Sequence, residues 1–251
     1  TVNKHLPKEL KQKGLRVNHS NLCSEITLPT SDERTAVCCL SSLNLEYFDE
    51  WSVDPIFIED IVRMLDNVLS NFTKTAPLVM WRATKSAESE RSIGLGTMGF
   101  HSYLQRNGVA LQSPMSMGPN IKIFKHIKKE CDKVNMLLGK ERGEAPDMKG
   151  TGKRFAHMIA IAPNASSSVI CGNTSPSIEP LRANAFSQKT LSGTFLLKNK
   201  YLRNLLEKKG MNTKDVWTNI ITNRGSVEHL ECLNAQEKNV FKTAIEIYLL
   251  K

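Results

Sequence analysis

The chain has 251 residues, and its 34 Lys and Arg against 25 Asp and Glu give a formal net charge of +9. Hydrophobic residues make up 40% and charged residues 24%, values close to globular averages, which excludes a disordered or fibrous chain. No apolar run reaches the roughly 20 residues that a membrane helix needs. We therefore expect an ordinary globular protein with no membrane association.

The cysteines and the chain start indicate the compartment. Cysteines stand at positions 23, 38, 39, 131, 171 and 232, and the first 20 residues resemble neither a signal peptide nor a transit peptide. Thiols in that context are typically reduced, so we expect a cytoplasmic protein. The chain begins with Thr1 rather than Met, and we expect it to be a piece of a longer chain.

The excess of basic residues raises the alternative of nucleic-acid binding. Five Lys and Arg lie within residues 1–20, and a second basic stretch runs at helical spacing from Lys122 to Lys129. Aromatic residues are only 6% of the chain, and no RNP-like or zinc-knuckle pattern accompanies the charges. A solvated lysine face explains the pattern better.

Apolar periodicity predicts the elements of the first half of the chain. Residues 36–45 form a compact apolar run that is typical of a buried strand. Asp54 and Pro55 open a helix whose apolar positions recur every three or four residues over 58–72. Two further helices are expected over 94–107 and about 121–138.

The second half of the chain continues this alternation. Residues 156–163 indicate a short buried strand, and the small, polar residues 164–180 indicate a loop that approaches a ligand closely. Asn234 and Glu237 have capping-box spacing and begin a helix. Its buried side is expected to hold Val240, Phe241, Ala244 and Ile245. Strands that alternate with long helices predict an α/β domain.

Two patterns that could indicate nucleotide or metal binding lack the context they need. Gly94, Gly96 and Gly99 match G-x-G-x-x-G, but no hydrophobic strand precedes them and no acidic residue follows about 20 residues later. We interpret these glycines as positions that let a helix pack closely. The histidines and cysteines show no metal-ligand spacing, so we expect no metal site.

Asn21, Cys23 and Glu25 stand at alternate positions within SNLCSEITLP. In an extended segment their side chains would share one face. A carboxylate raises the pKa of a nearby thiol, so this pattern suits a neutral thiol that reacts homolytically beside a carboxylate base better than it suits a thiolate nucleophile. The alternative is a buried cysteine on a strand with two polar neighbours.

Several segments occur together in an order that resembles one family. They read SNLCSEITLP, AVCCLSSLNL, RSIGLGTMGFH and IAPNASSS…SPSIEP, and KTLSGTF, DVWTNI and RGSVEHLECL extend the pattern. The chain resembles the large, catalytic subunit of class I ribonucleotide reductase over nearly its whole length. The resemblance implies an α/β fold that forms part of a ten-stranded α/β barrel. Residues 1–251 would then be a single portion of this catalytic barrel domain, with a finger loop near 18–30 and the second half-barrel over about 36–251.

The resemblance also implies roles for matching residues. Cys23 corresponds to the thiyl-radical cysteine of the finger loop, which abstracts the 3′-hydrogen of a ribonucleotide. Glu25 corresponds to the carboxylate that takes the 3′-hydroxyl proton, and Asn21 to the amide that binds the ribose hydroxyls. Cys38 corresponds to one of two cysteines that reduce the 2′ carbon and become a disulfide. The segment that binds the substrate diphosphate corresponds to Pro163, Asn164, Ala165, Ser166, Ser167 and Ser168.

Such an enzyme, an oxidoreductase, reduces ribonucleoside diphosphates to deoxyribonucleotides for DNA synthesis. The resemblance implies a metal-containing small subunit that supplies the radical, a thioredoxin-type or glutaredoxin-type dithiol as reductant, and a homodimer of the complete large subunit. We expect this chain to bind no cofactor directly. The N-terminal regulatory part that binds ATP and dNTP effectors, the second redox cysteine and the C-terminal tail are expected to lie outside the chain, which would work only after assembly with them.

Two alternatives stay open. An adenosylcobalamin-dependent ribonucleotide reductase would share the finger-loop chemistry. A non-catalytic, basic remnant of the scaffold would instead bind nucleotides or nucleic acid. Nucleic-acid affinity that falls steeply with salt, together with indifference to nucleoside diphosphates, would favour the remnant.

Overall fold

A computed structural model describes residues 2–191 and 193–248. The chain divides into two compact units. Unit 1 comprises Thr1–Leu43, Asp49–Thr97 and Ile123–Pro163, and unit 2 comprises Asn44–Phe48, Met98–Lys122 and Asn164–Lys251. The expectation of a single domain portion over 1–251 is not decided by this division and stays a prediction.

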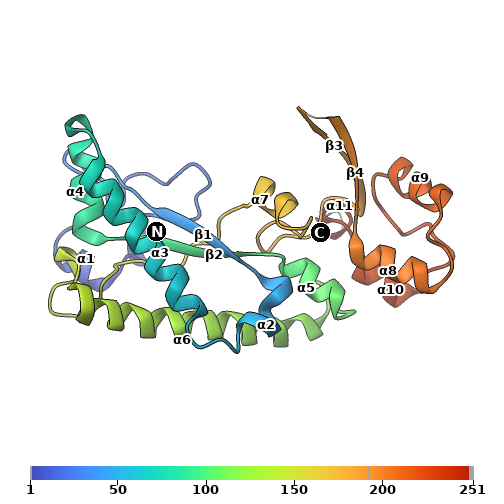
Figure 1. The fold of residues 1–251 in the computed structure, drawn as a ribbon, viewed down its shortest axis with the longest axis horizontal. Helices are drawn as coiled ribbons and strands as arrows, with labels where there is room; N and C mark the ends of the chain where they lie inside the picture. The colour runs from blue at the N-terminus through green and yellow to red at the C-terminus, as the bar shows by residue number, and fades with distance from the viewer. Residues whose placement is uncertain (1, 192, 249–251) are drawn as a thin grey trace. The chain divides into compact units, whose positions relative to one another are not determined.

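Unit 1 holds a small sheet and the longest helices (Figure 1). Four of its elements, β1, α2, β2 and α6, extend past a boundary of the unit. Its elements are η1 (Val2–Lys4), α1 (Lys8–Gln12), β1 (Cys39–Asn44), α2 (Phe48–Trp51), α3 (Phe57–Thr75), η3 (Leu78–Met80), α4 (Trp81–Glu90), β2 (Ile93–Met98), α6 (Met117–Arg142) and η5 (Pro146–Met148).

The sheet of unit 1 is built around β2. Strands β1 and β2 are hydrogen-bonded neighbours. Leu40 lies beside Gly94 and Ser42 beside Gly96, so the two strands run in the same direction. Leu95 also forms a parallel bridge with Ile159. Every residue of β2 is buried, as is usual for parallel strands. The strand expected over 36–45 is therefore confirmed as β1, whereas the one expected over 156–163 is reduced to a single bridge.

The helix expected over 94–107 is wrong in its first half. Residues 93–98 form β2, and helix α5 (Phe100–Arg106) begins only after Gly99. The glycines let strands, not a helix, approach closely, because a Cβ atom at Gly96 would lie 2.4 Å from the Ala160 carbonyl oxygen. Gly99 has a φ of 84° at the start of α5, a conformation that favours glycine. A short apolar run does not by itself distinguish a buried strand from a helix.

Helix α3 confirms the amphipathic pattern of the sequence. Ile58, Val62, Leu65 and Leu69 are buried along one face at spacings of three or four residues. The helix ends at Thr75, because Ala76 precedes Pro77 and adopts an extended conformation. The helix expected over about 121–138 is also confirmed, within α6.

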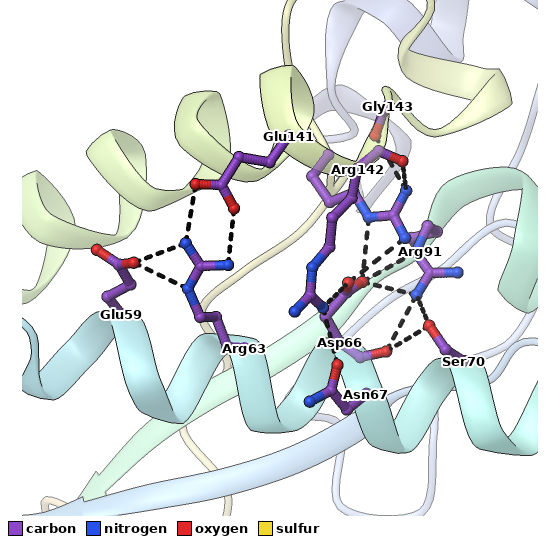
Figure 2. Close-up of polar contacts among 10 residues, drawn as sticks. Glu59, Arg63, Asp66, Asn67, Ser70, Arg91, Glu141, Arg142 and Gly143 are labelled. Carbon is purple, nitrogen blue, oxygen red and sulfur yellow. Dashed lines mark hydrogen bonds and ion pairs between the residues drawn. The ribbon is translucent and has the colours of Figure 1, made fainter.

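Asp66 is fully buried on α3 and holds a cluster of arginines. Its carboxylate pairs with Arg91 at 2.6 Å and with Arg142 at 2.7 Å (Figure 2), and with Arg154 at 3.2 Å. Burial alone would raise the pKa of Asp66, but hydrogen bonds from Arg142 and Arg91 outweigh burial and lower it. The arginines follow α4, end α6 and precede the bridge at Ile159, so one carboxylate joins four parts of unit 1.

A second contact joins α3 to α6 near the surface. Figure 2 shows the Arg63 guanidinium between the carboxylates of Glu59 and Glu141, at 2.7 and 2.8 Å. Glu59 lies one helical turn before Arg63 on α3, and Glu141 lies near the end of α6. These side chains are partly exposed, so the contact contributes less to stability than the buried Asp66 cluster.

A buried carboxyl group ends helix α4. Glu90 accepts hydrogen bonds from the Ser86 hydroxyl at 3.1 Å and from the Ser92 hydroxyl at 3.0 Å. The Ser92 Oγ atom also lies 2.9 Å from Nδ1 of His157. Burial raises the pKa of Glu90 to about 7 and lowers the pKa of His157 to about 4. This group connects α4 to the segment that pairs with β2.

Unit 2 contains a hairpin and short helices (Figure 1). Strands β3 and β4 pair in an antiparallel register from Ala185 opposite Lys198 to Thr190 opposite Gly193. The elements are η2 (Leu45–Tyr47), α5, η4 (Pro114–Ser116), α7 (Ala165–Ile170), β3 (Ala185–Thr190), β4 (Gly193–Lys198), α8 (Lys200–Lys208), α9 (Lys214–Thr222), α10 (Ala235–Val240) and α11 (Ala244–Tyr248).

The core of unit 2 forms where α8, α9 and α10 bury their apolar sides, with Trp217 among its largest members. The capping box predicted at Asn234 and Glu237 is present and begins α10. The helix breaks after Val240, because the Thr243 N–H donates to Glu246 and starts α11. Ile245 is consequently exposed instead of buried. Within residues 2–191 and 193–248, no helix has both the length and the apolar character to cross a membrane.

Replacing Asp66 by Asn keeps the size of the side chain but leaves three guanidinium groups around a neutral amide. Removal of one partner from a buried ion-pair network typically costs about 3–5 kcal/mol. We expect a free energy of unfolding lower by about that amount, measured as a lower urea midpoint. Asp132→Asn is the matched control on α6, because its pair with Lys128 is exposed and worth no more than about 1 kcal/mol. Equal losses in the two variants would contradict the central role of Asp66.

Glu90 and His157 give opposite pH dependences of stability. Between pH 4.5 and about 7 the unfolded carboxyl is ionised while folded Glu90 keeps its proton, so stability falls as pH rises. Between about pH 4 and 6.5 the unfolded imidazole is protonated while folded His157 is neutral, so stability rises with pH. We expect the two trends to offset over their shared window. The free energy of unfolding, measured by urea titration at several pH values, should then fall with pH in His157→Asn and rise in Glu90→Gln, by at most about 1.4 kcal/mol per pH unit. Parallel profiles in both variants would contradict this assignment.

Candidate functional site

Residues 18–30 form a loop whose two ends are joined. The Asn18 side chain donates to the Thr30 carbonyl oxygen at 2.7 Å, and the Thr30 N–H donates to the Arg16 carbonyl oxygen at 3.1 Å. Compact loops with closed ends frequently carry functional residues. The predicted finger-loop residues Asn21, Cys23 and Glu25 all lie within this loop.

The loop is not extended at these residues, so the expectation that the three side chains share one face is wrong. The Ser24 N–H donates to the Asn21 carbonyl oxygen, and Ser24 has a φ of 59°. The Asn21 side chain stabilises this turn, because its Oδ1 atom accepts a hydrogen bond from the Ile26 N–H at 3.2 Å. The turn leaves Cys23 exposed.

Glu25 turns toward the interior of unit 1. Its Oε2 atom is buried and has no hydrogen-bond partner among the residues that the structure describes. A buried carboxylate oxygen without a partner is energetically costly unless a ligand or water satisfies it. The residues that follow, Ile26 and Leu28, are buried and pack with Ala160 and Cys38.

Cys38 lies directly before β1 in a partly buried position. Its pKa is raised to about 12 by burial and by the nearby Cys39, Glu90 and Glu25. The thiol is therefore neutral near pH 7. A Cβ atom on Gly94 would lie 3.2 Å from the Cys38 sulfur, so glycine at that position leaves room for the thiol beside β2. Among the predicted catalytic residues, the structure thus brings Glu25 and Cys38 into electrostatic contact.

No motif in the sequence points to Glu90, Ser92 and His157, whose hydrogen-bonded group lies beside Cys38. Glu90 acts on the Cys38 thiol through its charge. Ser92 and His157 are 65 residues apart in the sequence and meet only because the segment at Ile159 pairs with β2. The sole signal in the sequence is a charged SERS segment directly before an apolar strand, which by itself indicates a surface turn.

The predicted diphosphate-binding segment begins a short helix. Pro163 and Asn164 precede α7, and Asn164 has a φ of 56° at the start of that helix. Ser166 and Ser167 are exposed, whereas Ser168 is buried and its carbonyl oxygen accepts the Thr174 N–H at 3.0 Å. Residues 164–180, expected to be a loop, therefore include one helix of six residues. In the part of the chain that the structure describes, no three His, Cys, Asp or Glu side chains gather as a metal site.

Known proteins resemble this chain along almost its whole length. The family model described as "Ribonucleotide reductase, barrel domain" matches residues 1–151 and 146–249. The ribonucleoside-diphosphate reductase large subunit of Invertebrate iridescent virus 3 is 53% identical over 250 residues, which are 98% of this chain and 40% of that protein. A putative ribonucleoside-diphosphate reductase large subunit of Frog virus 3 is 46% identical over 98% of this chain and 44% of that protein.

A solved structure supports the same relationship. The alpha subunit of the Actinobacillus ureae class Id ribonucleotide reductase superposes with a TM-score of 0.88 at 42% identity, covering 96% of this chain and 45% of that one. This chain therefore spans less than half the length of these relatives. The predicted fold class, an α/β chain that is part of a reductase barrel, is confirmed, while the finger loop stays a prediction. The chain belongs to the ribonucleotide reductase barrel-domain family.

Proposed function

We propose that this chain is a catalytic portion of a ribonucleoside-diphosphate reductase, which reduces the ribose 2′ position to make deoxyribonucleotides for DNA synthesis. The family match and the names of the relatives support this activity. They do not favour a cobalamin-dependent enzyme or a non-catalytic remnant that binds nucleic acid. The observation that carries the proposal is the buried Glu25 oxygen, which has no hydrogen-bond partner among the described residues and belongs to a carboxylate that acts electrostatically on the neutral thiol of Cys38.

In this proposal Cys23 carries the thiyl radical. Abstraction of the 3′-hydrogen requires a sulfur that can approach the sugar, and the turn at Ser24 leaves Cys23 exposed on its loop. Because a hydrogen atom is transferred, the reaction needs no thiolate and no neighbouring base for the sulfur. Cys23 then differs in role from Cys38, which is held inside unit 1.

Glu25 takes the proton of the 3′-hydroxyl group in this proposal. Loss of the 2′-hydroxyl as water becomes easier as the 3′-hydroxyl proton is removed. The buried Oε2 atom has an open hydrogen-bonding site for that hydroxyl. Asn21, which we propose binds the ribose hydroxyls, also fixes the turn through its Oδ1 atom, and its amide nitrogen can donate to an oxygen of the sugar.

Cys38 is proposed as one of two thiols that reduce the substrate. The two-electron reduction converts two thiols into one disulfide, so a second cysteine is required. We assign that cysteine to the part of the large subunit that this chain does not span. A neutral thiol suits this step, because Cys38 can give a proton to the departing water as its sulfur is oxidised.

Residues 163–168 are proposed to hold the substrate diphosphate. The resemblance supports this assignment, together with the exposed hydroxyls of Ser166 and Ser167. Hydroxyl groups and backbone N–H groups are common ligands of phosphate. No cofactor is assigned to the chain itself.

The proposed partners follow from the same chemistry. They are a radical-generating, metal-containing small subunit, the remaining segments of the large subunit and a thioredoxin-type or glutaredoxin-type dithiol. The complete large subunit is proposed to form a homodimer that responds to ATP and dNTP effectors. A cytoplasmic location is consistent with six free cysteines, because thiols stay reduced there.

Replacing Cys23 by Ser in the enzyme assembled with its remaining segments and small subunit should abolish turnover of ribonucleoside diphosphates. A serine O–H bond is too strong to be converted readily into the radical that abstracts a carbon-bound hydrogen. Deoxyribonucleotide formation should be measured by chromatography. Cys171→Ser, which changes another exposed cysteine, serves as the control and should leave turnover unchanged. Turnover by the Cys23→Ser enzyme would refute the proposed role.

Replacing Glu25 by Gln should lower kcat by about 10²–10⁴-fold, the usual contribution of a general base. The amide has nearly the same size but cannot accept the 3′-hydroxyl proton. Steady-state kinetics should show a much smaller change in KM, because the amide still forms hydrogen bonds. Glu33→Gln, an exposed residue that follows the same loop, is the matched control. A kcat within twofold of the parent enzyme would exclude Glu25 as the base.

A further inference from the structure

The Glu90 carboxyl is buried, and Nδ1 of His157 lies 3.9 Å from its Oε2 atom. Its two oxygens accept hydrogen bonds from Ser86 and Ser92, and no Lys or Arg of the described residues forms an ion pair with it. Arg34 and Asp147 act on it in opposite directions and pair with each other at 2.7 Å. Burial therefore dominates, and the pKa of Glu90 rises to about 7. Near neutral pH the carboxyl group is divided between its protonated and ionised forms.

Ser92 couples the protonation of Glu90 to the tautomer of His157. The serine hydroxyl has one proton and lies 3.0 Å from Glu90 Oε2 and 2.9 Å from His157 Nδ1. When Glu90 is ionised, Ser92 donates to Glu90, and Nδ1 must carry a proton that it donates to Ser92. When Glu90 is protonated, it donates to Ser92, which donates to an unprotonated Nδ1. Burial lowers the pKa of His157 to about 4, so the imidazole is neutral in both arrangements near pH 7.

This group lies at the start of β2, next to Cys38. The Ile93 N–H donates to the His157 carbonyl oxygen at 3.0 Å, and a Cβ on the following Gly94 would lie 3.2 Å from the Cys38 sulfur. The charges near the thiol are those of Glu25 and Glu90, and Arg91 lies close to the neighbouring Cys39. The His157 side chain is 19% exposed, so it connects the buried group to solvent.

We propose that Glu90, Ser92 and His157 form a proton relay that neutralises the Glu90 carboxylate whenever a thiolate forms on Cys38. A thiolate and a carboxylate that share a buried site raise each other's affinity for protons. A proton enters at His157, passes through the Ser92 hydroxyl and reaches Glu90. Glu90 and Cys38 together then hold one negative charge instead of two. Glu90 is a positioning residue, since it acts on Cys38 through its charge.

The role of the relay during turnover rests on the proposed function of Cys38. After each reduction of substrate, a dithiol must reduce the disulfide that Cys38 has formed. One thiolate of the dithiol attacks, the Cys38 S–S bond breaks and Cys38 leaves as a thiolate. The second sulfur of the dithiol completes its own disulfide, so the dithiol loses two electrons and its two protons end on the two released thiols. The relay protonates Glu90 while the Cys38 thiolate exists and returns that proton to solvent afterwards.

The relay predicts a tautomer change that NMR can detect. The full chain should be labelled with ¹⁵N-histidine and titrated. As the pH rises, His157 should convert from the Nε2–H to the Nδ1–H tautomer with a midpoint near pH 7, without becoming charged. His157→Asn assigns the signals. The change should disappear in Glu90→Gln and in Ser92→Ala, and persist in Glu88→Gln, an exposed residue of the same helix. An unchanging tautomer, or the same transition in Glu90→Gln, would overturn the relay.

The coupling to Cys38 is tested separately by alkylation. Iodoacetamide reacts with the thiolate, and peptide mass spectrometry gives the rate at Cys38 alone. Removing the Glu90 charge should make thiolate formation easier, so Glu90→Gln should react about three- to fourfold faster at alkaline pH for each unit by which the thiol pKa falls, because a less basic thiolate is also a weaker nucleophile. Glu88→Gln should react at the parent rate, and equal rates in Glu90→Gln and the parent would overturn the coupling. Neither measurement involves turnover, so these failures are distinct from failure of the proposed function, which Cys38→Ser in the assembled enzyme tests.

Discussion

The close approach of backbone segments at Gly94 and Gly96 organises unit 1. A Cβ at Gly94 would lie 2.8 Å from the Ala160 side chain, and one at Gly96 would lie 2.4 Å from the Ala160 carbonyl oxygen. Real Cβ atoms do not approach backbone oxygens so closely, so only glycine allows β1, β2 and the segment around Ile159 to pack together. That packing brings Cys38, Ala160 and the loop residues Ile26 and Leu28 into one cluster.

The same approach creates the electrostatic environment of Cys38. The strand contact between Ile93 and His157 brings the imidazole to Ser92. Helix α4 ends at Glu90, shortly before β2 begins at Ile93. The Asp66 cluster supports this geometry, because Arg91 follows Glu90 and has a φ of 45°. A strained, left-handed arginine persists only where surrounding contacts hold it, and here two of its nitrogens bind Asp66. The buried pair between Arg91 and Asp66 and the buried carboxyl group of Glu90 therefore belong to the same turn between α4 and β2.

The sequence predicts those elements whose signal is local. The apolar face of α3, the run that becomes β1 and the capping box of α10 each depend on residues close together in the chain. The sequence does not predict strand β2, because glycines between apolar residues indicate a strand only when the neighbouring strands are known. The turn at Ser24 depends on one side-chain hydrogen bond from the Ile26 backbone to Asn21, which alternation of residue types cannot show.

The candidate site was predictable only where a resemblance supplied it. Cys23, Glu25 and Cys38 were found through motifs of a family, and the structure then added the buried Glu25 oxygen and the raised pKa of Cys38. Glu90 and His157 have no such motif, and their meeting depends on a pairing between distant segments.

The charges around Cys38 explain why Glu90 and His157 matter for a redox thiol. Glu25, Glu90 and Cys38 can each carry a negative charge, and burial raises the pKa of both Glu90 and Cys38. The nearby Arg34 is already paired with Asp147, and Arg91 is already paired with Asp66. Since no unpaired Lys or Arg among the described residues compensates for a new thiolate there, a proton must arrive when one forms. The carboxyl group best suited to accept that proton near pH 7 is one whose pKa lies near 7 and whose hydrogen bonds lead toward solvent, and Glu90 meets both conditions.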